Sequence, residues 1–396
     1  MQHRFIIFLT SIVLWNCSPK EQVEDNLFYQ LQSAIESQDE KLVDVLWDSL
    51  QQENQPYIWS DSVAFIYRGE ASSVNWNGDF NGWGGDASFY NKGSRIGESN
   101  FWVLKTKFPE DARFDYKIVV DGKWMLDPAN KAIQMAGVGG LSPNSEIRMP
   151  KSIPSKWTKD TAKSKGKLTD WITHSSDNLG YDINYKVYTP HNYEQLDSLP
   201  VIYSTDGNEY THPQLGAMIE ILDNLIEQEQ IKPVLAVFID PREPDNPQNN
   251  RRMEELNLNE KFKDFITSEL VPKIDSSYKT ANNRANRVIM GTSMGGLNAS
   301  YIGAKSADMF GKVLIQSPAY RYNPTIYDVV NESDQWPLKV SISTGVFNDT
   351  QAAALKMKAI YESKLDAIQY IEVNEGHSWG NWRNTLDDQL IYLLGN

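Results

Sequence analysis

The stretch Val288-Ile289-Met290-Gly291-Thr292-Ser293-Met294-Gly295-Gly296 decides the fold of this chain. It begins with three apolar residues, continues with the pattern Gly-x-Ser-x-Gly, and leads into a segment of helical character. In such a turn between strand and helix, the tight backbone pushes the serine hydroxyl out of the sheet, and small flanking residues let the two elements pack closely. We therefore predict a nucleophile elbow with Ser293 at its tip.

The histidines identify a candidate base, because α/β hydrolases carry their catalytic groups in the chain order Ser, then Asp or Glu, then His. The chain has five histidines: His3, His174, His191, His212 and His377. Only His377 follows Ser293. It lies in Glu375-Gly376-His377-Ser378-Trp379-Gly380, directly after the β-branched and aromatic run 368–373, which we expect to be the last strand. His377 is therefore the predicted base.

The acid has more candidates. The carboxylates between Ser293 and His377 are Asp308, Asp328, Glu332, Asp334, Asp349, Glu362, Asp366, Glu372 and Glu375. Asp349 ends the loop that follows the expected strand 340–343, and open α/β sheets place functional groups at the carboxyl ends of their strands. We predict Asp349 as the acid, with Asn348 and Glu375 as the reserve candidates. The alternative for Asp349 is an N-cap of the helix expected at about 350–365.

These three residue types imply acyl transfer. His377 would take the proton of Ser293 as the serine attacks an ester carbonyl, and Asp349 would orient the imidazole. The oxyanion needs two donors. We expect the amide of Met294 and an amide of the loop 205–208, with Gly207 as the candidate.

Residues 168–396 resemble the esterase group that includes enterochelin esterases, esterase D and bacterial feruloyl esterases. The matching segments are Val187-Tyr188-Thr189-Pro190, Leu199-Pro200-Val201-Ile202-Tyr203 with Asp206-Gly207, Arg252 with Glu255-Leu256, Glu269-Leu270-Val271-Pro272, the Ser293 elbow and residues 376–383. Glu375 stands where the group usually has a glycine. The resemblance implies that Arg252 lies near the substrate, where it would contact a carboxylate or phenolate or form an internal salt bridge. Aromatic acyl groups would stack on Tyr210, Trp379 and Trp382.

Residues 57–150 carry a second pattern, short alternating segments separated by Gly, Asn and Asp turns, which predicts a small β-sandwich. The stretches 78–83 and 120–130 resemble family 48 carbohydrate-binding modules, which are immunoglobulin-like early-set domains. The resemblance assigns sugar contacts to Trp83, Lys117, Trp124 and Asn144. A leucine of that family has no clean match, since Gly140 or Leu141 stands at its position. The alternative is a domain that binds no sugar and positions a lid over the active site.

The amino terminus resembles a lipoprotein signal peptide over residues 1–17. The apolar run 5–14 follows a basic start, and Cys17, the single cysteine of the chain, comes directly after it. We expect a lipid anchor on Cys17 and a location in the bacterial cell envelope, in the periplasm or at the outer membrane; the alternative is an ordinary secretory peptide. Residues 18–55 have the spacing of a short helical pair, and the basic, polar segment 151–167 is expected to be a linker.

Composition excludes some partners. The net charge of −14 argues against nucleic acid and disfavours anionic polymers as ligands. The single cysteine excludes an intramolecular disulfide, and we find no spacing typical of metal ligands and expect no cofactor.

The sequence thus predicts an α/β protein: an α/β-hydrolase fold with a mostly parallel, doubly wound sheet, preceded by an immunoglobulin-like β-sandwich. The leading functional hypothesis is a serine esterase that removes feruloyl or acetyl groups from polysaccharide. Hydrolysis of a catecholate siderophore trilactone is the alternative within enzymes. The alternative of another class is a glycan-binding surface lipoprotein with an inactive hydrolase domain.

Overall fold

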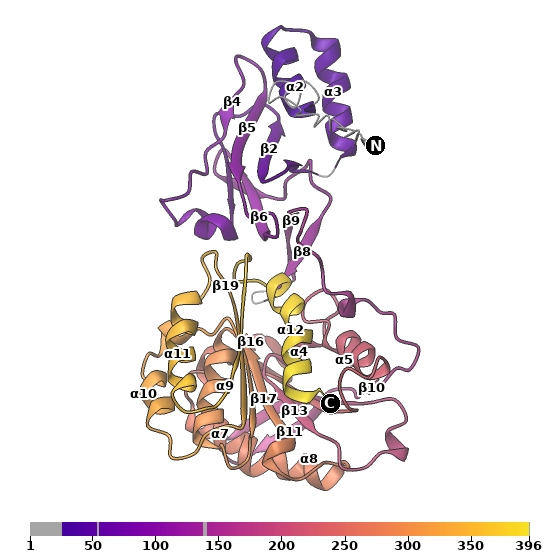
Figure 1. Cartoon of the computed structure of the whole chain (residues 1–396), viewed down its shortest axis with the longest axis vertical. Coiled ribbons are helices and arrows are strands. Elements are labelled where there is room, and N and C mark those ends of the chain that lie inside the picture. Colours follow the sequence, from indigo (N-terminus) through magenta and orange to yellow (C-terminus); the bar gives the residue numbers. More distant parts are fainter. Residues whose placement is uncertain (1–25, 54, 138–140, 396) are drawn as a thin grey trace, which may run out of the picture.

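A computed structural model describes residues 26–53, 55–137 and 141–395. Two bodies lie one above the other along the long axis, and the chain passes from the amino-terminal body to the carboxyl-terminal one (Figure 1). The predicted signal peptide and Cys17 lie outside the described residues. Within the described parts, no helix combines the length and apolar character needed to cross a membrane.

The amino-terminal body is a sandwich of two antiparallel sheets. The first contains, in spatial order, β1 (Tyr57–Trp59), β2 (Ser62–Arg68), β5 (Phe101–Lys107) and β4 (Ser94–Arg95). The second contains β3 (Val74–Gly78), β6 (Arg113–Val120), β9 (Ser142–Arg148) and β8 (Ile133–Ala136), with β7 (Lys123–Met125) paired to β6. Alternate side chains of each strand point inward, so that Phe65 of β2 meets Tyr116 of β6 in the core at a centroid distance of 5.1 Å.

Two helices cover the outer face of the first sheet (Figure 1). They are α2 (Leu27–Glu36) and α3 (Glu40–Gln52), capped by Asn26 and Asp39 at their amino ends. Their apolar faces pack on Ala64 and Ile66 of β2 and on Phe101 of β5. The helical pair expected from the spacing therefore shields a sheet face that would otherwise be exposed.

The carboxyl-terminal body is built on a sheet of mostly parallel strands. Its order is β10 (Lys167–Leu168), β12 (Tyr181–Thr189), β14 (Leu235–Asp240), β13 (Val201–Ser204), β17 (Arg287–Thr292), β18 (Lys312–Gln316), β19 (Lys339–Gly345) and β20 (Gln369–Val373), with β11 (Ile172–Ser176) paired to β12. The pairs from β14 to β20 are parallel, whereas β10, β11 and β14 pair with β12 in the antiparallel sense. The central strand β17, which leads to Ser293, is buried throughout, as expected for a sheet covered on both faces.

Helices cover both faces of this sheet. One face packs against α7 (Glu260–Asp264), the π-helical turn Phe265–Leu270, α8 (Val271–Ser277), α9 (Met294–Lys305), α10 (Ile326–Asn331) and α11 (Gln351–Glu362). The other face packs against α5 (Met218–Glu227) and α12 (Trp379–Leu394). This doubly wound arrangement is the predicted α/β-hydrolase architecture.

Two connecting segments carry more structure than the sequence pattern suggested. The loop after β13 contains the short helix α4 (Gly207–Tyr210), and the segment after β14 folds into the hairpin β15 (Arg242–Glu243) and β16 (Asn246–Asn250), followed by α6 (Arg252–Glu255). The remaining short turns are 3-10 segments at Asp79–Gly84, Lys156–Thr158, Tyr193–Gln195, Arg284–Asn286 and Tyr320–Tyr322. The expected linker lies along α5, where Asn224 Nδ2 donates to the carbonyls of Trp157 and Lys159.

Candidate active site

Ser293 lies at the turn between β17 and α9 in a strained conformation, with φ 57° and ψ −113°. Its amide donates to the carbonyl of Gln316, and its own carbonyl accepts from Ala319. The flanking glycines allow the strand, the turn and the helix to pack closely. A Cβ on Gly291 would lie 2.5 Å from the backbone of Gly295, and a Cβ on Gly295 would lie 2.5 Å from Thr205 Oγ1. Larger residues would therefore push helix and strand apart.

His377 and Asp349 lie beside this serine, on loops that follow the last two strands. His377 Nε2 is 2.9 Å from Ser293 Oγ, and His377 Nδ1 is 2.6 Å from Asp349 Oδ1. The imidazole packs edge-on against Trp382, with ring centroids 4.9 Å apart. These contacts place a nucleophile, a base and an orienting acid within hydrogen-bond reach of one another.

The environment of Asp349 keeps it charged. Burial opposes ionisation, but hydrogen bonds from His377, Ser317 and the Gly345 amide outweigh it and hold the pKa of Asp349 below its ordinary value. Thr350, not Asp349, is the N-cap residue of α11. The carboxylate is thus directed at the imidazole and not at the helix terminus.

The two amides expected at the oxyanion hole both begin helices. Met294 is the first residue of α9 and Gly207 is the first residue of α4. The first N–H groups of a helix have no acceptor within it, so they can bind an external anion where they face one. Met294 lines the cavity beside Ser293. Gly207 is not among the residues that line this cavity and packs closely against Phe238, so only the first of the two predicted donors lies at the site.

A cavity of about 460 Å³ opens on Ser293 and His377. Both bodies supply its walls. The sandwich contributes Asp79, Trp83, Asp115, Ala136, Gly137 and Asn144, and the α/β body contributes, besides Ser293, Met294, Asp349 and His377, residues such as Glu209, Arg252, Arg321, Trp379 and Trp382. This volume suits a ligand of moderate size. Because the sandwich supplies part of the lining, it forms part of the site.

Glu209 gives this cavity a titratable group. Its Oε2 accepts from Trp379 Nε1 at 2.8 Å. Burial and the nearby Asp206 raise the pKa of Glu209 to about 7, against the opposing effects of Trp379, Arg252 and Arg242. The charge of the cavity wall therefore changes near neutral pH.

The substrate contacts predicted for the α/β body need correction. Tyr210 is fully buried, and its hydroxyl donates to Gln316 Oε1 at 2.8 Å, so its ring is not available to a ligand. Arg252 lines the cavity, but its guanidinium binds Asp206 through Nε at 2.6 Å and Nη2 at 2.9 Å. Of the two roles considered for Arg252, a substrate contact and an internal salt bridge, the structure shows the salt bridge. Trp379 and Trp382 do line the cavity, each largely buried.

The four candidate sugar contacts do not form one exposed surface. Trp124 is 51% exposed and stacks on Trp83 at a centroid distance of 6.4 Å, while Lys117 is half-buried on β6. Asn144 is buried and donates to Asp115 Oδ2 at 3.1 Å. Trp83 and Asn144 line the cavity. Strands β6, β8 and β9 of the sandwich reach toward the α/β body (Figure 1).

Sequence reasoning missed several polar residues at the site. Arg113 and Asp115 interrupt an apolar strand at alternate positions, which is a signal of buried charge, and Asp79 lies in the stretch 78–83 that the resemblance had singled out. Ser317 directly follows β18, at the same sheet edge as Asp349. Among the described residues, no cluster of His, Cys, Asp and Glu has the arrangement needed to hold a metal ion.

Relatives of known sequence share part of the chain. The uncharacterized protein YjcH of Bacillus subtilis is 23% identical over 231 residues, 55% of this chain and 94% of that protein. An endo-1,4-beta-xylanase/feruloyl esterase of Xylanibacter ruminicola is 26% identical over 228 residues, which are 55% of this chain and 30% of that protein. The iron(III) enterobactin esterase of Escherichia coli K12 is 31% identical over 187 residues, 44% of each protein.

Solved structures share the fold of both bodies. An enterobactin esterase from Shigella flexneri superimposes with a TM-score of 0.71 at 21% identity, over 87% of this chain and 97% of that one. The ferric enterobactin esterase of Salmonella typhimurium gives the same TM-score at 18% identity. The predicted α/β-hydrolase fold is confirmed, and so is the predicted carboxylic ester hydrolase. The model of the family described as "Putative esterase" matches residues 176–393, more than half of the chain, and the protein therefore belongs to this esterase family.

Proposed function

We propose that this protein hydrolyses carboxylic esters of neutral carbohydrates and releases feruloyl or acetyl groups. The observation that carries the proposal is the shared cavity, whose walls join Ser293 and His377 to aromatic and carboxyl side chains of the sandwich. Aromatic faces suit the apolar faces of pyranose rings, and carboxyl and amide groups suit sugar hydroxyls. Asp79, Asp115 and Asn144 are such groups, and they line the same cavity as Ser293.

The proposed reaction passes through an acyl-enzyme. Ser293 Oγ attacks the ester carbonyl carbon while His377 takes its proton, and the amide of Met294 stabilises the oxyanion. His377 then gives this proton to the leaving sugar oxygen, and the acyl group stays on Ser293. Water attacks the acyl-enzyme by the same proton transfers in reverse, which frees the acid and restores the serine. The charged Asp349 stabilises the imidazolium formed in each half.

A catecholate siderophore trilactone is the second candidate. Similarity to enterobactin esterases supports it, in particular the shared arrangement of both bodies. Charge argues against it, because a ferric tris-catecholate is an anion and this chain has a net charge of −14. Of the arginines that line the cavity, Arg252 is paired with Asp206, and Arg321 lies exposed at the rim. A neutral sugar ester meets no such repulsion.

A substrate panel tests this proposal. The wild type and Ser293→Ala are compared on methyl ferulate, a feruloylated arabinoxylan oligosaccharide, acetylated xylan and a ferric catecholate trilactone. We expect the highest kcat/KM on a feruloyl or acetyl sugar ester, with activity lost in Ser293→Ala. Preferential cleavage of the trilactone would reverse the order of the two candidates.

We also propose that Cys17 carries a lipid that holds the protein at the bacterial cell envelope. The support is the sequence of the amino terminus, with its apolar run directly before the single cysteine. In cells fed a labelled fatty acid, the wild type should take up label and Cys17→Ala should not. Equal labelling of both would contradict the anchor.

A further inference from the structure

The base loop, residues 374–378, meets the sandwich at Arg113, the first residue of β6. The Arg113 amide donates to the carbonyl of Asn374 at 3.1 Å, and Arg113 forms an isolated parallel bridge with Glu375. The two bodies are thus joined through main-chain pairing next to His377.

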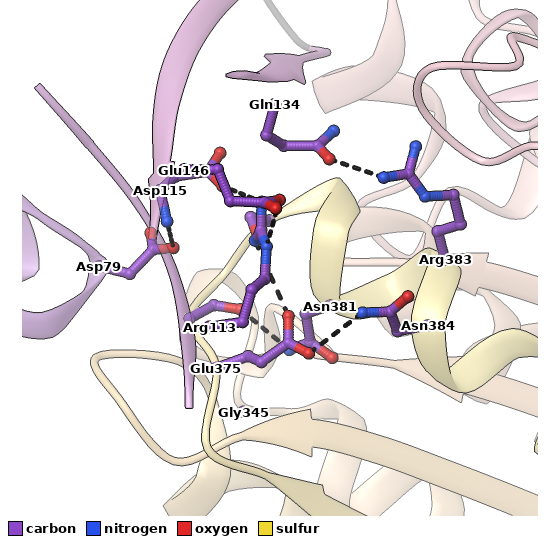
Figure 2. A network of polar contacts seen from close by, with 12 residues as sticks. Asp79, Arg113, Asp115, Gln134, Glu146, Gly345, Glu375, Asn381, Arg383 and Asn384 are labelled. Atoms are coloured by element: carbon purple, nitrogen blue, oxygen red, sulfur yellow. Dashed lines mark hydrogen bonds and ion pairs between the residues drawn. The ribbon is translucent and has the colours of Figure 1, made fainter. Parts of the chain in front are cut away.

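The side chain of Arg113 holds the same loop on the other side of His377. It is fully buried, and Nη1 donates to Ser378 Oγ at 2.8 Å and lies 3.7 Å from Glu375 Oε2. On the sandwich side Nε donates to Glu146 Oε2 at 2.8 Å, and Nη2 binds Asp115. Figure 2 shows the guanidinium between Glu146 above and Glu375 below. One arginine therefore fixes the residues that flank the base.

The carboxylates around Arg113 require a charged guanidinium at this position. Burial alone would lower the pKa of Arg113, but Asp115, Glu146 and Glu375 raise it, so the guanidinium stays charged. The same arginine helps to hold the pKa of Glu146 below its ordinary value, against the effect of burial. A planar guanidinium serves several acceptors in fixed directions, which a lysine ammonium does not.

The sandwich explains two glycines close to His377, Gly376 in the base loop and Gly380 in α12. A Cβ on Gly380 would lie 2.1 Å from Arg113 Cζ, and a Cβ on Gly376 would lie 2.3 Å from the Cβ of Asp79. Both positions have ordinary backbone angles, so the requirement is for space and not for a special conformation. The glycines on either side of His377 therefore leave room for the sandwich.

The loop that carries Asp349 also contacts the sandwich, near Arg113. Asn348, directly before Asp349, donates through Nδ2 to the carbonyl of Asp79 at 3.1 Å. Phe347 packs edge-on against Phe114, the neighbour of Arg113, with centroids 4.8 Å apart. Strand β6 and the turn at Asp79 thus contact both loops that carry the partners of Ser293.

We propose that Arg113 is a positioning residue for His377, through which the sandwich holds the base loop in the conformation that aligns the imidazole between Ser293 and Asp349. The sandwich then completes the active site and is not a separable targeting module. This inference needs only the esterase activity, and not the proposed preference for sugar esters.

The test compares Arg113→Lys and Ser378→Ala with Arg287→Lys as matched control. Arg287 is also buried and paired, with Asp275, but it lies at the far end of β17 from Ser293. The substrate is p-nitrophenyl acetate, whose hydrolysis does not depend on sugar recognition. The readouts are kcat, KM, Tm, and the low-field proton NMR signal of the hydrogen between His377 Nδ1 and Asp349.

We expect Arg113→Lys to lower kcat by about 10- to 100-fold with little change in KM, since a displacement of about 1 Å at the reacting groups can cost that much. The low-field signal should shift or broaden. Ser378→Ala, which keeps the charges in place, should show a smaller loss of kcat and a smaller shift. Arg287→Lys should lower Tm and leave kcat and the signal as in the wild type.

Wild-type kcat and an unshifted signal in folded Arg113→Lys would overturn the proposal, and so would equal losses in Arg113→Lys and Arg287→Lys. If Arg113→Lys does not fold, Ser378→Ala decides: wild-type kcat and an unshifted signal in that variant overturn the proposal. A failure of sugar esters in the substrate panel would leave all these values unchanged, so the two proposals fail separately.

Discussion

At the scale of single residues, the position of Ser293 is stabilised by hydrogen bonds to the residues beside it. Arg252 binds Asp206 and also donates through Nη2 to the carbonyl of Thr292 at 3.1 Å. It thereby ties the loop after β13 to the end of the strand that carries the serine. The buried carboxylate of Asp349 is held in a similar way by Ser317 and the Gly345 amide. The reacting groups are aligned before a substrate arrives.

The Asp349→Asn variant tests the role of the acid. The amide keeps the volume but cannot select the imidazole tautomer that accepts the proton of Ser293, so kcat should fall by about 10⁴-fold with little change in KM. Steady-state kinetics on p-nitrophenyl acetate measures this loss, and Asp308→Asn, on the turn after α9, is the control. A variant with near wild-type kcat would show that Asp349 is not the acid.

The ionisation of Glu209 should make KM for anionic substrates depend on pH. Because its pKa is about 7, the cavity wall gains a negative charge as the pH rises from 6 to 8. KM for a substrate with a free carboxylate should then rise by about 3- to 10-fold, since a like charge in a partly solvated cavity costs on the order of 1 kcal/mol.

Methyl ferulate, which has no such charge below its phenol pKa, is the matched neutral substrate for this comparison. In Glu209→Gln the rise of KM should disappear. A rise that persists in this variant would assign the effect to another group.

At the scale of elements, the edges of the sandwich act as walls and supports of the active site. Trp83 lies in the turn Asp79–Gly84 with a positive φ of 58°, and its Nε1 donates to Asp79 Oδ1 at 3.2 Å. A left-handed conformation is unfavourable for a bulky residue, so it persists only where surrounding contacts determine it. This strain presents an aromatic ring to the cavity and to Trp124.

Trp83→Ala should separate sugar esters from simple esters. Loss of the ring should raise KM for a feruloylated oligosaccharide by about 3- to 10-fold, the range expected for one aromatic contact. KM and kcat on p-nitrophenyl acetate should stay close to the wild type. Trp59→Ala, on β1 in the other sheet, is the control. Equal KM values for the oligosaccharide in wild type and Trp83→Ala would exclude this contact.

The sequence pattern predicted the catalytic groups but not the contacts between the two bodies. Ser293, His377 and Asp349 could be named because strand ends and chain order constrain them. The role of Arg113 could not, since its bond to Ser378 joins positions 265 residues apart and depends on how the two bodies pack. Tyr210 failed as a substrate contact because helix α4 turns its ring into the core, where Gln316 satisfies the hydroxyl. Motif position does not reveal side-chain direction.

At the scale of the whole molecule, the two bodies are coupled by more than the linker. Arg113, Phe114 and Asp79 contact the catalytic loops, and Arg383 Nη2 donates to Gln134 Oε1 of β8 at 2.7 Å (Figure 2). The segment 151–167 also forms hydrogen bonds with side chains of α5. Separating the bodies would break these contacts, including those of Arg113 Nη1 with Ser378 and Glu375.

We therefore expect a single unfolding transition. Calorimetry should give one peak whose calorimetric and van't Hoff enthalpies agree, and loss of esterase activity should follow the same curve. Two resolved transitions, with activity retained after the first, would show that the sandwich unfolds independently and would contradict the coupling.

Ser293, activated by His377 in a cavity that the sandwich helps to line, is expected to form the acyl-enzyme. The most direct test is reaction with a fluorophosphonate probe, followed by mass spectrometry of the digested protein. We expect one adduct, on the peptide that contains Ser293, formed at a rate that falls strongly in His377→Ala and to zero in Ser293→Ala. An adduct on another residue, or undiminished labelling of Ser293→Ala, would contradict it.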